Sequence, residues 1–182
     1  MEKKAIFAGF GGQGIMLMGQ CLSQAAVIEG MEVTYTQSYG SEMRGGTANC
    51  AVIISDEQIG SPIVDKADGC VVMNLPSLEL FASIVCPGGV LVINSSLVNR
   101  KPDRKDIHCV EVPATEIANQ LGNSRGANLV ALGAFIEATQ MTKPASILKA
   151  LKLVLSPHRL NTLPLNKKCF QEGRDWTLRA NK

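Results

Sequence analysis

The sequence has few aromatic residues and no strong charge of either sign. Phenylalanine, tyrosine and tryptophan together make up 4% of its 182 residues, and the formal net charge is +2. Proteins that bind nucleic acid commonly use aromatic side chains to stack on bases and a strongly basic surface to meet the phosphates. The composition therefore argues against nucleic acid as a partner.

Closely spaced cysteines are also lacking. The six cysteines include no Cys-x-x-Cys pair: they are Cys21, Cys50, Cys70, Cys86, Cys109 and Cys169. Zinc and iron–sulfur sites usually need close pairs of thiolates. We therefore expect reduced, mostly buried cysteines that serve packing, and no metal or cluster held by this chain alone.

Charge is absent from residue 5 to residue 28. This run is interrupted by glycines and by polar residues such as Gln20, Ser23 and Gln24, whereas a membrane-spanning helix or a signal peptide needs a continuous apolar stretch. The run instead predicts a buried strand, a glycine turn and a buried helix. We expect no membrane contact and a cytoplasmic location.

Apolar patterning predicts alternating strands and helices. Strands are expected over residues 4–8, 32–36, 47–55, 70–73, 90–94 and 107–112, and helices over 13–29, 76–85, 114–121, 128–140, 145–155 and 166–176. This alternation is typical of an α/β fold with a mainly parallel sheet. We predict a single three-layer α/β/α Rossmann-like domain over residues 1–182, with a helical C-terminal region.

A glycine-rich turn follows the first expected strand. Residues 9–14 read Gly9-Phe10-Gly11-Gly12-Gln13-Gly14, the Gly-x-Gly-x-x-Gly form of dinucleotide-binding turns. Glycines let the backbone approach a pyrophosphate, and the start of the following helix offers free N–H groups. The same glycines could also serve only a tight turn, or the close packing of another chain.

The second expected strand argues against a nicotinamide cofactor. An NAD site usually places an acidic residue near the end of this strand to hold the ribose hydroxyls. Here the strand ends in Thr36 and Gln37, and no basic residue between Lys4 and Arg44 marks an NADP site. We therefore expect that no nicotinamide cofactor is bound.

A second polar loop follows that strand. The stretch SYGSEMRGG contains Tyr39, Gly40, Ser41, Glu42, Arg44, Gly45 and Gly46. The loop should lie at the carboxyl edge of the sheet, where α/β domains bind their ligands. A guanidinium flanked by glycines suits a carboxylate or phosphate. A surface turn with a weak Glu–Arg pair explains the same composition equally well.

Several other polar residues are weaker candidates. Ser95 and Ser96 end a strand at the same expected edge. The segment Ser124–Asn128 leads into a helix, so it is a second candidate anion site, ranked below the Arg44 loop. His108 and His158 are far apart in sequence and have no evident acidic partner, so we expect structural roles for both.

Four stretches together resemble the gamma subunits of 2-oxoacid:ferredoxin oxidoreductases. They are FAGFGGQG, TYTQSYGSEMRGG, NLVALGAF and LNKKCFQEGRDW. Enzymes for pyruvate, 2-oxoglutarate, branched-chain oxoacids and indolepyruvate all use such a domain, and the compact length is most similar to the 2-oxoglutarate type. The resemblance covers about residues 3–176, and the pairing of the glycine turn with the second loop makes it specific. Gly9, Gly11, Gly12 and Gly14 match the family's glycine turn.

The resemblance implies a subunit of a multi-chain enzyme that is inactive alone. Such complexes convert a 2-oxoacid and coenzyme A into an acyl-CoA, carbon dioxide and reduced ferredoxin. Thiamine diphosphate, Mg²⁺ and iron–sulfur clusters would be held mainly by alpha, beta and delta-type partner subunits. Ferredoxin would interact with the assembled complex.

The resemblance also implies that the glycine turn, Gln13 included, and the second loop contact a ligand or a partner chain. Arg44 is expected to meet a coenzyme A phosphate or the oxoacid carboxylate, with Glu42 orienting it. Two alternatives stay open: a stand-alone nucleotide-binding oxidoreductase, and a non-catalytic scaffold subunit.

Overall fold

The computed structural model describes residues 1–40 and 46–180. Within these ranges the strands are β1 (Glu2–Phe10), β2 (Glu32–Tyr39), β3 (Thr47–Ser55), β4 (Ala67–Val72), β5 (Val85–Asn94) and β6 (His108–Val112). The α-helices are α1 (Ile15–Ile28), α2 (Leu75–Phe81), α3 (Ala114–Gln120), α4 (Ala127–Thr139), α5 (Pro144–Val154) and α6 (Leu163–Ala180). Two short 3₁₀ helices are η1 (Ala82–Ile84) and η2 (Pro157–Thr162).

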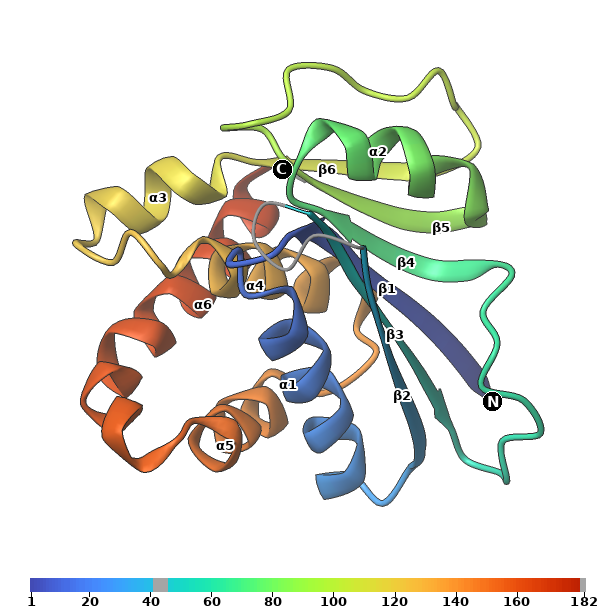
Figure 1. Ribbon diagram of the computed structural model, residues 1–182, viewed down its shortest axis with the longest axis horizontal. Coiled ribbons are helices and arrows are strands. Elements are labelled where there is room, and N and C mark those ends of the chain that lie inside the picture. The colour runs from blue at the N-terminus through green and yellow to red at the C-terminus, as the bar shows by residue number, and fades with distance from the viewer. Residues whose placement is uncertain (41–45, 181–182) are drawn as a thin grey trace.

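The strands form one sheet in the order β2-β3-β1-β4-β5-β6 (Figure 1). β1, β4, β5 and β6 pair in parallel, and β3 is antiparallel to both β1 and β2. A parallel connection needs a crossover of a dozen or more residues. The link of residues 40–46 is shorter than that, so β3 pairs antiparallel with β2. The other side of β3 pairs with β1. The expected mainly parallel α/β sheet is confirmed, with this one antiparallel insertion.

Helices cover the two faces of the sheet unequally. On one face α1 packs against β1, β2 and β3, while α4 packs against β4, β5 and β6. On the other face α2 packs against β1 and β4, so this layer is thinner (Figure 1). The three-layer arrangement expected from the sequence is therefore present.

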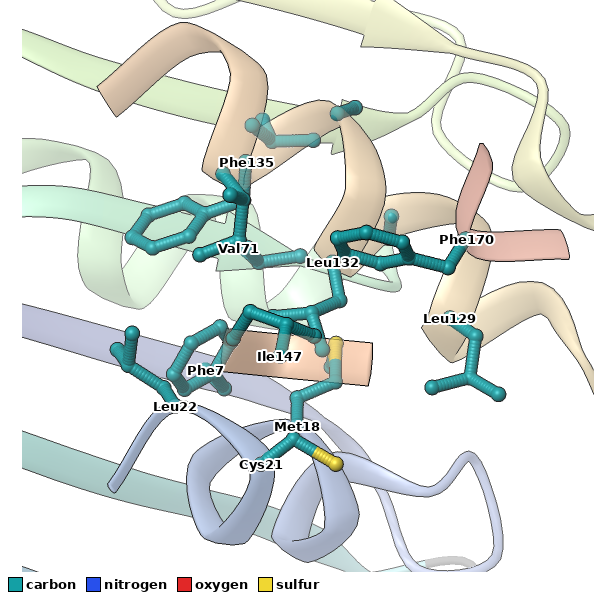
Figure 2. Packing of buried hydrophobic residues seen from close by; sticks show 14 of the residues in the cluster. Phe7, Met18, Cys21, Leu22, Val71, Leu129, Leu132, Phe135, Ile147 and Phe170 are labelled. Carbon is teal, nitrogen blue, oxygen red and sulfur yellow. The ribbon is translucent and has the colours of Figure 1, made fainter. Parts of the chain in front are cut away.

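The larger hydrophobic core lies between the sheet and α1, α4 and α5. Phe7 of β1 and Phe135 of α4 meet edge to face, with ring centroids 5.2 Å apart, a favourable geometry for aromatic pairs. Figure 2 shows Leu22 and Val71 beside these rings, and Met18 and Leu132 nearby. One face of the uncharged first helix is buried here, whereas Val27 and Ile28 at its end are exposed.

α4 and α6 of the C-terminal region are in contact backbone to backbone. A Cβ added at Gly133 of α4 would overlap the carbonyl of Phe170, and one at Gly173 of α6 would overlap the carbonyl of Val130. Glycine is required at both positions because any side chain would push the helices apart. This contact accounts physically for the glycines of NLVALGAF and of the last helix.

Element boundaries differ from the predictions mainly at prolines. Pro87-Gly88-Gly89, expected as a turn before a strand, lies inside β5, where the pairing with β4 shifts register and Gly88 has φ 77°. Pro164, expected as a break, lies in the first turn of α6. A proline is tolerated there because its missing N–H would have no helical partner.

All six cysteines lie in the described ranges and are free, as expected. Cys21, Cys50, Cys70 and Cys169 are buried, and the other two are half-buried. None of the helices described has the length and hydrophobicity needed to span a lipid bilayer.

Candidate functional site: a cleft at the glycine turn

The glycine turn joins Phe10, the last residue of β1, to Ile15, the first of α1. Gly12 and Gly14 have φ 96° and 74°, a left-handed conformation that favours glycine. A Cβ at Gly9 would lie 2.6 Å from Oε1 of Gln13, and a Cβ at Gly14 would overlap the side chain of Asn128. Gly9, Gly12 and Gly14 are thus required by the geometry of the turn itself.

Gln13 points inward and closes this turn. Its Oε1 accepts hydrogen bonds from the backbone N–H of Phe10 at 2.7 Å and from Nδ2 of Asn74 at 3.3 Å. Asn74 directly precedes α2, whose Ser77 N–H it caps at 2.9 Å. The side chain of Gln13 therefore links the glycine turn to the start of α2 and is not among the residues that line the cleft described next.

The insertion of β3 brings the second loop to the glycine turn. Thr47 pairs with Phe10, and the backbone N–H of Gly11 donates to the carbonyl of Gly46 at 3.0 Å. On the other side of the loop, the N–H of Gly40 donates to the carbonyl of Thr47 at 2.7 Å. The two ends of the loop thus lie beside the turn. Ser41, Glu42, Arg44 and Gly45 fall outside the described residues.

A cleft of about 650 Å³ opens beside the turn. Its lining comes from the glycine turn, the facing ends of β2 and β3, the segment before α4, and η2 with the start of α6. The residues are Phe10, Gly11, Gly12, Gly14, Ile15, Met16, Leu17, Tyr39, Ala48, Asn123, Arg125, Asn128, Leu129, Leu155, Arg159, Thr162 and Asn166. Segments far apart in the sequence therefore build one site.

The described lining of the cleft is positively charged. Arg125 and Arg159 are its only charged side chains, and neither pairs with a carboxylate within the described part of the chain. The N-termini of α1 and α4 also border it, and neither helix has an acidic residue in its first turn. Helix N-termini and guanidinium groups both favour anions. The arrangement suits a ligand with phosphate or carboxylate groups.

Asn128 joins the two helix starts. Its side chain is 3% exposed, and its Nδ2 donates to the carbonyl of Gly14 at 3.1 Å. Its Oδ1 is buried and has no hydrogen-bond partner among the described residues. Asn128 therefore positions the glycine turn against α4 at the inner wall of the cleft.

With this geometry in view, comparison with known proteins gives the family. Residues 4–176 match the family model described as pyruvate ferredoxin/flavodoxin oxidoreductase. The chain belongs to this oxidoreductase family. The resemblance inferred from the glycine turn and the second loop is confirmed at this level.

Individual members of the oxidoreductase family are similar over most of the chain. The ketoisovalerate oxidoreductase subunit VorA of Methanothermobacter thermautotrophicus is 37% identical over 96% of this chain, which spans only 36% of VorA. The 2-oxoglutarate synthase subunit KorC of Methanothermobacter marburgensis is 34% identical, with both chains covered completely. The crystal structure of a keto/oxoacid ferredoxin oxidoreductase gamma subunit from Geobacter sulfurreducens has a TM-score of 0.83 at 30% identity, covering 97% of this chain and 99% of that one.

Two of the weaker candidates from the sequence have different outcomes. One pair lies away from the cleft, and the other segment contributes to its lining. Ser95 and Ser96 do not line it. The N–H of Ser95 donates to the carbonyl of Val112 at 2.9 Å, and Oγ of Ser96 accepts from the N–H of Glu116 at 3.2 Å. The segment Ser124–Asn128, ranked below the Arg44 loop, supplies two lining residues.

Arg159 is a lining residue that sequence reasoning missed. It lies in η2, which reaches the cleft only through the packing of the C-terminal helices. Nothing in its sequence surroundings marks it as part of a site.

The described residues of this oxidoreductase chain do not fit an iron–sulfur cluster or a metal. No three His, Cys, Asp or Glu side chains come together among them. Burial also raises the pKa of Cys21 and Cys50 to about 12, which disfavours the thiolate that binds metal. We therefore assign no step to a metal or cluster in this chain.

Proposed function

We propose that the chain is the gamma subunit of a multi-subunit 2-oxoacid:ferredoxin oxidoreductase in the cytoplasm. The complex would oxidatively decarboxylate a 2-oxoacid with coenzyme A to give an acyl-CoA, carbon dioxide and reduced ferredoxin. Family membership supports the reaction class. We propose 2-oxoglutarate as the oxoacid, because the 2-oxoglutarate synthase subunit KorC is 34% identical to this chain over all of its length.

The other parts of the reaction fall to partner subunits in this proposal. Thiamine diphosphate with Mg²⁺ would supply the carbanion chemistry, and iron–sulfur clusters would carry electrons to ferredoxin. Alpha, beta and delta-type subunits would hold these groups. Such a division agrees with the described cleft lining, which contains no Asp, Glu, His, Cys or Lys to act as acid, base or nucleophile.

One observation supports the proposed role of this chain. The cleft beside the glycine turn is positively charged, and its described lining contains no acidic residue. We propose that it holds the phosphate groups of coenzyme A. Arg125 and Arg159 would pair with phosphate oxygens, and the N–H groups at the starts of α1 and α4 would add hydrogen bonds. Arg44, oriented by Glu42, would meet the same anion or the oxoacid carboxylate.

Kinetics of the assembled complex test this proposal. We expect Arg125→Ala and Arg159→Ala each to raise the KM for coenzyme A about tenfold or more, because a hydrogen bond to a charged group contributes about 1.5–3 kcal/mol. The kcat and the KM for the oxoacid should stay unchanged, since these contacts bind ground state and transition state alike. Arg44→Ala tests the second loop in the same assay.

Arg100→Ala is the matched control. Arg100 is an exposed arginine that pairs with Glu79 of α2 and does not line the cleft, so its removal should leave all constants unchanged. Unchanged constants for coenzyme A in fully assembled Arg125 and Arg159 variants would refute the cleft assignment and favour the scaffold alternative. NAD binding by the purified chain would favour the stand-alone oxidoreductase.

A further inference from the structure

The two edges of the sheet are built differently. β6, at one edge, has only five residues, one of its carbonyls already has a side-chain partner, and it carries a charged pair. Nε1 of Trp176 donates to the backbone carbonyl of Glu111 at 2.8 Å, and Nζ of Lys101 lies 2.6 Å from the Glu111 carboxylate. Short strands, charges and covering groups are the usual means of preventing an edge strand from pairing with another chain.

β2, at the opposite edge, has fewer of these protections. Its eight residues pair with β3 without a register shift, from Glu32 opposite Ser55 to Tyr39 opposite Ala48. It contains no proline, and Glu32 is its only charged residue. Its other side pairs with nothing in the part of the chain that the structure describes. A row of backbone N–H and C=O groups is thus left to pair with a further strand.

The groove next to this edge has an uncharged lining. Behind β2 lies α1, which has no charged residue from Ile15 to Ile28. The groove has a volume of about 330 Å³ and is lined by Gln20, Ser23, Gln24, Val27, Tyr35 and Val154. Val27 is 54% exposed. Depletion of charge is typical of the buried centre of protein interfaces, so the edge and the helix behind it form one surface suited to contact.

We propose that β2 pairs antiparallel with β2 of a second copy of this chain, about a two-fold axis perpendicular to the sheet. The sheet would then continue through both copies, and the outer sides of the two α1 helices would meet on the same face. This inference does not depend on the proposed function.

The sequence of β2 suits pairing with itself. In an antiparallel pair, opposite residues point to the same face of the sheet. In a strand that pairs with its own copy, one residue must therefore lie opposite itself at the two-fold axis. Tyr35 and Thr36 are the two central residues of β2. In either register the two Glu32 carboxylates lie at opposite ends of the paired strands, so no like charges face each other. With the axis beside Tyr35, the central pairs are Tyr35–Tyr35 and Thr34–Thr36, whereas with the axis beside Thr36 they are Thr36–Thr36 and Tyr35–Gln37. Thr–Thr and aromatic pairs are favourable across strands.

Charge exchange at Thr36 tests the proposal on the full chain. Thr36 is exposed and would lie close to its own copy near the axis. Mass in solution is measured by light scattering after size-exclusion chromatography for the wild type, Thr36→Glu, Thr36→Lys, and an equimolar mixture of the two variants. We expect a dimer for the wild type, a monomer for each variant alone, and recovery of the dimer in the mixture.

Ser83 of η1, which is exposed on the α2 side of the molecule, provides the matched control. Ser83→Glu and Ser83→Lys should leave the dimer unchanged, and circular dichroism should show that all variants are folded. A monomeric wild type, or Thr36 variants that remain dimeric on their own, would overturn the proposal. Turnover of the complex is not read in this assay, so its outcome is separate from the test of the cleft.

Discussion

The buried thiols show how strongly single residues respond to their surroundings. Cys21 on α1 and Cys50 on β3 are both fully buried. Burial raises the pKa of each thiol to about 12, from an ordinary value of 9.0. The folded protein therefore keeps these protons at pH values where the unfolded chain releases them.

The free energy of unfolding should consequently fall at high pH. Because the folded pKa is raised, stability is fully present below pH 9 and is lost as the pH rises from 9.0 toward about 12. Each thiol contributes a slope of about 1.4 kcal/mol per pH unit in that range. Urea unfolding at several pH values measures it.

Cys21→Ala should make this slope shallower by one thiol's contribution, whereas Ser83→Ala, at an exposed position without a thiol, should leave it unchanged. An equal slope in the wild type and in Cys21→Ala would contradict the assignment.

At the scale of elements, the contact of α4 with α6 determines how the C-terminal region covers the sheet. Gly133 and Gly173 let each helix backbone touch the other. Because the neighbouring atoms are backbone carbonyls, neither helix can yield as a flexible side chain would.

We expect Gly133→Ala and Gly173→Ala each to lower the free energy of unfolding by about 3 kcal/mol or more, at or above the upper end of ordinary overpacking. Gly60→Ala is the control, because a Cβ there has no heavy atom within 4 Å. Chemical denaturation followed by circular dichroism gives the values. Losses no larger than that of the control would show that the two helices can separate without cost.

The elements also show which parts of the structure could be predicted from sequence. The glycine turn and the helix after it follow local rules, so Gly12, Gly14 and the start of α1 were predictable. Strand periodicity does not specify neighbours, so the insertion of β3 between β2 and β1 was not. Arg159 reaches the cleft through the packing of η2, a long-range contact that no local pattern encodes. The prediction for Arg44 stays a prediction.

At the scale of the whole molecule, the described lining of the cleft favours anions and contains no Asp, Glu, His, Cys or Lys. The described cleft lining has two guanidinium groups and Tyr39, but no side chain that commonly transfers protons near neutral pH. The purified chain should therefore reduce no viologen dye with 2-oxoglutarate and coenzyme A. Activity should appear when the partner subunits are added, and heat-denatured chain is the control. Turnover by the chain alone would contradict the proposed division of labour.

The place of β3 in the sheet also bears on the order of folding. β1 has no strand neighbour among the residues before β3, because its partners are β3 and the later β4. β2 and β3, by contrast, form a local hairpin that needs only a short loop to close. We expect this hairpin to form early and β1 to join its free side. During synthesis, β1 would therefore pair with a neighbouring strand only after the residues up to Ser55 have been made. The glycine turn would adopt its final conformation only at that stage.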